Sequence, residues 1–241
     1  MQSRENIQEL NDHLQAFPKA EDIFTKDQQW LKKHFLPLMS IDLAEINPEW
    51  AGQKVYMLSP FEPYEVYIGY NTTEYHNEYT ATNWLAFKLT DDNKFEFLGK
   101  EGFFERTAIH DWDFNSEKEK EFQEMQKGYE KSKANFEKYG SLVSLQFPEY
   151  DGKPNFTKFL DILGGNWVGT ISSKEYPKAF DMKLDYEDED SDKWIKISYQ
   201  GNPFYFVAST PNYSWCDGHI DAIIMLYEPV SRIVLYTFDY S

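Results

Sequence analysis

Cysteine is almost absent from this chain, which has Cys216 as its only one in 241 residues. A lone thiol cannot form an intrachain disulfide, and secreted proteins of this size often contain several bridges. We therefore expect a reducing compartment, the cytoplasm. The first 17 residues lack the continuous apolar segment of a signal peptide, so no export is expected.

Arginine is scarce as well, with Arg4, Arg106 and Arg232 the only three. Lysine and arginine together number 24 against 41 acidic residues, which leaves a formal net charge of −17. Nucleic-acid phosphates require a basic protein face. The charge therefore excludes a nucleic-acid-binding protein and favours a basic partner.

Long apolar runs are missing too. The longest clean run covers residues 222–227, far short of the ~20 residues of a membrane-spanning helix. We therefore expect no membrane association. Apolar material is nevertheless plentiful, with 41% hydrophobic residues, 19 Phe, 17 Tyr and 7 Trp, so the chain should fold around a core rather than remain disordered.

Three segments have helical spacing. Ile7, Leu10, Leu14 and Phe17 predict an amphipathic helix that ends at Pro18. A second helix is predicted from Thr25, with Pro37 limiting its far end. The clearest helix covers residues 116–139, because Ser116 and Glu119 form a capping box and Gly140 suits a C-cap. A short helix is also expected over residues 155–163.

Strand patterns account for most of the rest. Residues 54–109 read as an antiparallel meander through KVYML, EVYIGY, NWLAFKL and KFEFLG, with a turn at residues 91–93. After the long helix, strands are predicted in SLVSLQF, FDMKLDY, KWIKISY, GNPFYFVAST and a final hairpin, IIMLYE with RIVLYTF. The predicted fold class is α+β, mainly antiparallel, with N-terminal helices and one long amphipathic helix near the middle. We expect one domain over residues 1–241. Two halves, 1–115 and 140–241, joined by the helix over 116–139, are the alternative.

The densest charge in the sequence is an acidic run between two predicted strands. Its members are Asp185, Glu187, Asp188, Glu189, Asp190 and Asp192. The run lacks the central Gly and the final Glu of a calcium-binding loop. We therefore predict no metal site, and interpret the run as a solvated hairpin tip, a partner-binding patch, or both.

Two other groups have residue types found at catalytic or metal sites. Cys216, Asp217, His219 and Asp221 are close in sequence, but the acids disfavour a thiolate and no second Cys supplies a zinc ligand. A structural turn is the favoured interpretation. His110, Asp111 and Asp113 alternate with aromatic residues, which favours an edge strand or loop. We predict no catalytic residue.

The glycine-rich stretch GGNWVG over residues 164–169 lacks the following Lys or Arg of a phosphate-binding loop. Its glycines are expected to allow a tight turn and close backbone approach around Trp167. No cofactor is predicted.

Aromatic residues in Asn-rich loops are candidate interface anchors, because Tyr and Trp dominate binding hot spots. Tyr75, Tyr79 and Trp84 belong to one such stretch. In the second, we predict that Tyr213 and Trp215, with the neighbouring Asp217, bind the partner together with the acidic run.

The C-terminal segment GNPFYFVASTPNYSWCDGHIDAIIMLYEPVSRIVLYTFDYS, with LGGNW upstream, resembles the tail of small bacterial immunity proteins, including those distantly similar to the YwqG-like family. It covers about the last third of the chain. The resemblance implies an acidic, cytoplasmic, non-enzymatic protein that binds and neutralises one toxin delivered by a neighbouring bacterium through type VI or contact-dependent secretion.

Two alternatives remain open at this stage. One is a small-molecule or carbohydrate-processing enzyme, in which paired carboxylates about 5–9.5 Å apart and tryptophans would form a sugar cleft. An adaptor that binds an effector for loading would share the same surface as an inhibitor. A concave pocket with perturbed carboxylates would favour the enzyme, and binding without protection would favour the adaptor.

Overall fold

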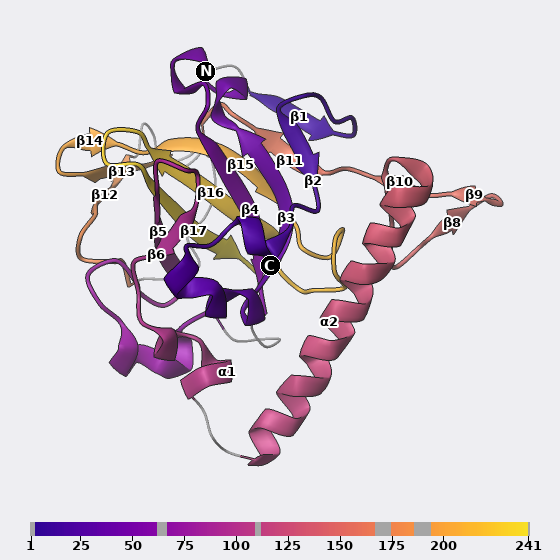
Figure 1. Cartoon of the computed structure of the whole chain (residues 1–241), viewed down its shortest axis with the longest axis horizontal. Helices are drawn as coiled ribbons and strands as arrows, with labels where there is room; N and C mark the ends of the chain where they lie inside the picture. The colour runs from indigo at the N-terminus through magenta and orange to yellow at the C-terminus, as the bar shows by residue number, and fades with distance from the viewer. Residues whose placement is uncertain (1–2, 62–66, 109–111, 167–174, 186–193, 241) are drawn as a thin grey trace.

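The computed structural model describes residues 3–61, 67–108, 112–166, 175–185 and 194–240. The centre of the molecule is a seven-stranded antiparallel sheet with the order β1-β11-β15-β16-β17-β5-β6 (Figure 1). Its strands are β1 (Arg4–Ile7), β5 (Trp84–Leu89), β6 (Phe95–Phe97), β11 (Leu160–Leu163), β15 (Tyr205–Thr210), β16 (Ala222–Glu228) and β17 (Ile233–Asp239). The protein is therefore α+β with mainly antiparallel sheets, as the sequence predicted.

The predicted C-terminal hairpin lies in the middle of this sheet, since β16 pairs with β17 from Ala222↔Asp239 to Glu228↔Ile233. Successive strand residues point to opposite faces. Ile223 and Met225 belong to one hydrophobic cluster, and Ile224 and Leu226 belong to another. Because both faces are covered, the strand is continuously apolar rather than alternating.

The larger cluster lies between the central sheet and a three-stranded sheet of order β2-β3-β4. These strands are β2 (Leu14–Ala16), β3 (Phe35–Asp42) and β4 (Lys54–Pro60). The long helix α2 (Trp112–Tyr139) adds Phe122, Met125 and Tyr129 to the same cluster. This helix confirms the strongest helical prediction and begins four residues before the expected cap.

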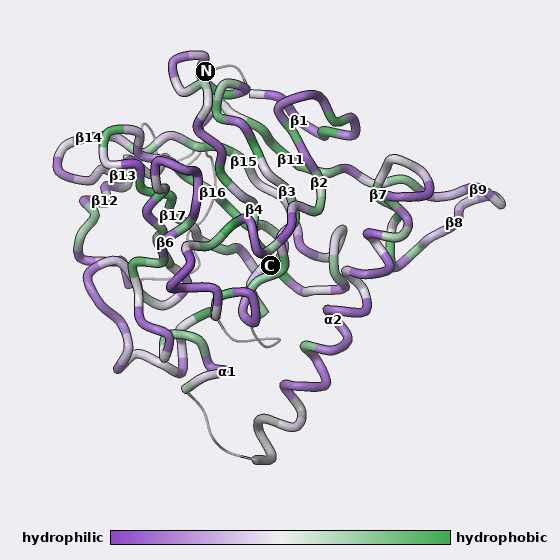
Figure 2. Tube along the Cα trace, in the orientation of Figure 1, coloured by the Kyte–Doolittle hydropathy of each residue, from purple (hydrophilic) through white to green (hydrophobic). Residues whose placement is uncertain are grey.

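The smaller cluster lies on the opposite face of the central sheet. It combines Leu226 and Leu235 with Phe180 and Ile197. Ile197 belongs to a three-stranded sheet of β12 (Asp181–Asp185), β13 (Trp194–Tyr199) and β14 (Asn202–Pro203). The apolar residues gather on the central strands, whereas α2 is largely hydrophilic along its length (Figure 2).

Short elements complete the described structure. The 3₁₀ turns are η1 (Ala20–Asp22), η2 (Lys26–Lys33), η3 (Leu43–Glu45), η4 (Pro48–Trp50), η5 (Tyr70–Tyr75) and η6 (Glu101–Phe103), and one helical turn is α1 (Glu105–Ala108). The remaining strands are β7 (Leu142–Val143), β8 (Glu149–Tyr150), β9 (Lys153–Pro154) and β10 (Phe156–Thr157). The last four form two separate two-stranded sheets beyond the C-terminal end of α2 (Figure 1).

The predicted first helix is wrong. The segment forms β1 and β2 instead, and Asn6 and Phe17 adopt positive φ angles of 54° that no helix contains. β1 pairs with β11, and β2 pairs with β3. These long-range backbone hydrogen bonds outweigh the weak intrinsic preference of a short helical pattern.

Two further helix predictions are corrected for related reasons. From Thr25 the chain forms the 3₁₀ segment η2, kinked at Gln28, whose side-chain amide pairs with the backbone of Phe97 (2.6 and 3.0 Å). Pro37 lies inside β3, at an irregularity in its pairing with β4. Residues 155–163 contribute strands β10 and β11, because Leu160 and Leu163 pair with β1 across the sheet.

The predicted meander is only partly correct. β4, β5 and β6 are strands, and Asn93 has the expected left-handed turn conformation with φ 59°. Residues 67–70, the described part of EVYIGY, are not a strand, and β4 and β5 belong to different sheets. Strands on both sides of α2 share the central sheet, so the helix does not separate two independent sheets.

Candidate protein-binding surface

The predicted acidic run follows β12, which pairs with β13 from Asp181↔Ser198 to Asp185↔Trp194. The backbone of Asp185 therefore lies at the end of this strand pair. Glu187, Asp188, Glu189, Asp190 and Asp192 lie outside the described residues.

The predicted anchors Tyr213 and Trp215 lie in a loop between β15 and β16, and the structure separates their roles. Trp215 is fully buried, so its prediction as a partner-binding residue is wrong. Its indole Nε1 donates to Thr210 Oγ1 at 3.1 Å, and its ring contacts Phe17 edge-on at 5.3 Å. Trp215 fills a position in the core, and its Asn-rich sequence context does not reveal this burial.

Tyr213 and Asp217 are exposed on the same loop. The loop is held by Asn212, whose Oδ1 accepts from Ile220 N at 2.8 Å and whose Nδ2 donates to Ser59 Oγ at 3.2 Å. Gly218 lies so close to Asn212 that an added Cβ would be 2.2 Å from its Nδ2. Tyr213 and Asp217 are therefore presented on an ordered backbone, and their contact with a partner stays a prediction.

Cys216 is buried between this loop and α2. Burial raises the pKa of its thiol to about 12, despite the opposing hydrogen bond with Ser59. A thiol with such a pKa is protonated at neutral pH and is a poor nucleophile. The structural interpretation of this cluster agrees with the geometry, while His219 lies exposed nearby.

The remaining sequence candidates fall in different places. His110 and Asp111 are outside the described residues, and Asp113 belongs to the first turn of α2. Gly164 and Gly165 have positive φ angles of 70° and 84°, and a Cβ on Gly165 would lie 2.6 Å from that of Ser3. Gly165 therefore lies close to Ser3, while Trp167, around which the close approach was predicted, lies outside the described residues.

Of the first group of aromatic candidates, Trp84 is fully buried in the smaller cluster and does not face solvent. Tyr79 is half-buried, and its hydroxyl lies 3.2 Å from that of Tyr199. This hydrogen bond and burial raise the pKa of Tyr79 to about 12. Tyr75 is also half-buried, against Gly102 of η6.

A buried polar cluster around His34 was not anticipated from the sequence. His34 stacks on Phe104 with ring centroids 4.3 Å apart, and its Nε2 lies 3.2 Å from Thr107 Oγ1. Burial, with smaller effects of Lys33 and Arg106, lowers the pKa of His34 to about 3. The ring is therefore neutral near pH 7, which suits a core position.

Arg106 connects this cluster to the long helix. Its guanidinium donates to Lys33 O at 2.7 Å and to Glu119 Oε2 at 3.1 Å, and it lies 4.8 Å from the centre of the Phe122 ring. One of the three arginines is thus committed to holding α1 between η2 and α2. Glu119, predicted as part of a cap, serves as its ion-pair partner.

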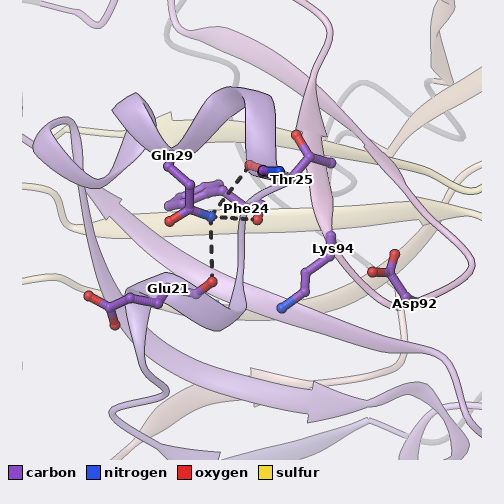
Figure 3. A pocket seen from close by; sticks show the side chains of 7 residues that line it. Glu21, Phe24, Thr25, Gln29, Asp92 and Lys94 are labelled. Atoms are coloured by element: carbon purple, nitrogen blue, oxygen red, sulfur yellow. Dashed lines mark hydrogen bonds between the residues drawn. The ribbon is translucent and has the colours of Figure 1, made fainter.

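A shallow depression of about 380 Å³ lies beside η2 (Figure 3). Gln29 Nε2 donates within it to three carbonyl oxygens, those of Phe24 at 2.8 Å and of Glu21 and Thr25 at 3.4 Å. Lys94 Nζ is bonded to Asp22 O. The Gln29 amide nitrogen and the Lys94 ammonium are thus already hydrogen-bonded to backbone carbonyls, so the depression offers little to orient a small substrate.

Within the described residues, no group of three or more His, Cys, Asp and Glu side chains is placed to hold a metal ion. Among the helices of the same residues, none has a stretch apolar enough to cross a bilayer. Comparison with protein families, with curated proteins and with solved structures gave no match for this chain.

Proposed function

We propose that this chain is a cytoplasmic immunity protein that binds a basic toxin domain and neutralises it. The observation that carries the proposal is the net charge of −17 in a folded protein with only three arginines. A field of this sign attracts a basic surface and raises association rates by ~10- to 1000-fold at low salt. The resemblance of the C-terminal third to immunity proteins supports the same class of partner.

The geometry of the described residues is also compatible with a binding role. The only thiol is buried and protonated, and the ordered loop around Asn212 presents Tyr213 and Asp217 outward. Protection against a toxin requires a long-lived complex, so we expect nanomolar affinity, about −12 kcal/mol. An interface of about 1,600 Å² in total suits such a complex.

The test is capture of partners from the native cell lysate at low and moderate salt, followed by co-expression of the captured domain in a sensitive host. Recovery of one basic, growth-inhibiting domain, with growth restored by this chain, is the expected result. Binding without restored growth would replace the proposal with an effector-loading adaptor. Absence of a stoichiometric partner would contradict both.

The acidic run provides a sharper test of the electrostatic part. Replacing Asp188, Glu189, Asp190 and Asp192 with Ser should slow association with the captured domain and flatten its salt dependence. A matched control replaces four exposed acids elsewhere, Asp12, Glu124, Glu130 and Glu137, and removes the same charge. Equal effects of the two variants would remove the run from the interface and leave only the global charge.

A further inference from the structure

Four large aromatic side chains are exposed within one short segment that begins at the last residue of α2. The exposed fraction is 39% for Tyr139, 62% for Phe147, 79% for Tyr150 and 50% for Phe156. The other exposed aromatic side chains of the described chain, Tyr70, Tyr176, Tyr205 and Tyr213, are spread over distant segments. We call residues 139–158 the aromatic arm.

The arm is a folded extension. β8 and β9 pair through Glu149↔Pro154 and Tyr150↔Lys153. Asp151 and Gly152 form their turn with φ angles of 52° and 71°. Positive φ at both central residues gives the tight hairpin turn that matches strand twist. The strands therefore hold a fixed geometry at the tip of the arm, where Tyr150 lies.

Hydrogen bonds to backbone carbonyl groups also fix the base of the arm. Asn155 Nδ2 donates to Phe147 O, Asn155 N donates to Pro148 O and Ser144 N donates to Asn155 O, each at 2.9 Å. At the end of α2, the rings of Tyr139 and Phe156 meet edge-on with centroids 5.9 Å apart. A backbone that is held in place before binding loses little conformational entropy in a complex.

The arm projects away from the body of the protein past the C-terminal end of α2 (Figure 1). β7 and β10 form the base of the arm next to α2, and Phe156 pairs with Val143 there. Each of its small sheets has two strands, so the backbone edges are not covered by further strands of the described chain. A projecting hairpin with exposed aromatic rings can enter a concave surface on another protein.

Charge identifies the kind of protein that fits. The arm contains two acids, Glu149 and Asp151, and two bases, Lys153 and Lys158, so it is neutral in a chain of −17. The acidic charge therefore lies outside the arm, on the rest of the molecule. A second copy of the chain would bring together two proteins that each have a net charge of −17, which repel one another. A basic protein is instead attracted by the acidic surroundings, and the neutral arm can be desolvated in the contact.

We infer that the aromatic arm is the docking element for the basic protein partner, which it contacts through Phe147 and Tyr150 in an apolar recess rimmed by basic residues. This inference rests on the proposed function for the class of partner, and it assigns the contact to a part of the chain that the sequence did not indicate. The acidic body steers the partner, and the arm sets how long the complex lasts.

The first experiment places a photoreactive phenylalanine analogue at position 147 or 150 of the full chain in its native cells. Position 205 serves as a matched exposed aromatic control on the central sheet. We expect both arm positions, and not position 205, to give one adduct with the same basic protein, identified by mass spectrometry. An adduct with a second copy of the chain, or no protein adduct, would overturn the inference.

The second experiment measures dissociation of the purified, identified partner. The double variant Phe147→Ser and Tyr150→Ser should release it about tenfold faster or more, as expected for hot-spot side chains, with unchanged thermal unfolding because both rings are exposed. Tyr70→Ser, at a 58% exposed side chain elsewhere, is the control. If growth protection is intact but the double variant does not change dissociation, the docking role is wrong and the proposed function stands. If the adduct and the faster release appear but the chain does not protect growth, the docking role stands and the proposed immunity function is wrong.

Discussion

At the scale of single residues, the loop between β15 and β16 places a core residue and an exposed residue within three positions. Trp215 is fully buried and Tyr213 is half exposed. Trp215→Ala should lower the free energy of unfolding by about 3–5 kcal/mol, as for other buried aromatic residues. Tyr213→Ala should change it by less than about 0.5 kcal/mol. Urea denaturation of both variants checks this, and equal losses would contradict the structure.

His34 gives the protein a defined pH dependence. Its folded-state pKa is lowered to about 3 from an ordinary 6.5, so the unfolded chain binds a proton between these values that the folded chain does not. Stability therefore falls as pH falls through this window. The loss from His34 alone should be about 2 kcal/mol between pH 6.5 and 5, at ~1.4 kcal/mol per unit.

The measurement is the urea midpoint at several pH values for the unmodified protein and for His34→Gln. The variant should have a shallower pH slope, whatever its absolute stability. A slope that is the same in both proteins would show that folding does not lower the pKa of His34.

Cys216 should be chemically silent in the folded protein. Burial raises the pKa of its thiol to about 12, so almost no thiolate forms. Burial also blocks the access that alkylation requires. Iodoacetamide at pH 8 should therefore leave the native protein unmodified and should label Cys216 completely in urea. Rapid labelling without denaturant would indicate that the loop opens.

At the scale of elements, one glycine of α2 allows the helix to lie close to the β15–β16 loop. A Cβ on Gly128 would meet Asp217 Cβ at 3.0 Å and Cys216 C at 3.1 Å. Gly→Ala inside a helix normally stabilises by about 1 kcal/mol. Here the clash with the β15–β16 loop should reverse the sign and destabilise by about 1–3 kcal/mol. Lys131→Ala, at an exposed position of the same helix, is the control in thermal unfolding.

The elements that the sequence predicted well are those decided locally. The long helix has its own amphipathic pattern, and β16 and β17 are joined by a short turn that Glu228 closes by accepting from Val230 N and Ser231 N at 2.6 and 2.7 Å. The N-terminal strands were missed because their partners are far away in sequence. Ile7 pairs with Leu160, and no local spacing contains that information.

The candidate partner-binding residues also depend on packing that local sequence does not show. Tyr213 and Trp215 are both aromatic residues in one polar loop, and only the packing of Phe17 and Thr210 around the indole distinguishes them. The aromatic arm was also hidden. Its strands have two residues each, too few for a periodic pattern, and its aromatic residues match the composition of the core.

At the scale of the whole molecule, the charge of −17 should make stability depend on salt. Self-repulsion destabilises a compact acidic protein, and screening lengths fall from about 30 Å at 0.01 M to about 8 Å at 0.15 M salt. The melting temperature at pH 7.5 should therefore rise over this range of sodium chloride. Near pH 4.7, the isoelectric point, the rise should disappear. A rise of equal size at both pH values would assign the effect to something other than net charge.

The order of strands in the central sheet has a consequence for biosynthesis. β5 is synthesised early, but Leu85 pairs with Tyr236, which is synthesised much later. Arg4 likewise pairs with Leu163. Sheets closed by such distant pairs form slowly, and their early strands stay apolar and unpaired on the ribosome. A nascent chain of this protein is therefore a natural client for chaperones until β17 is complete.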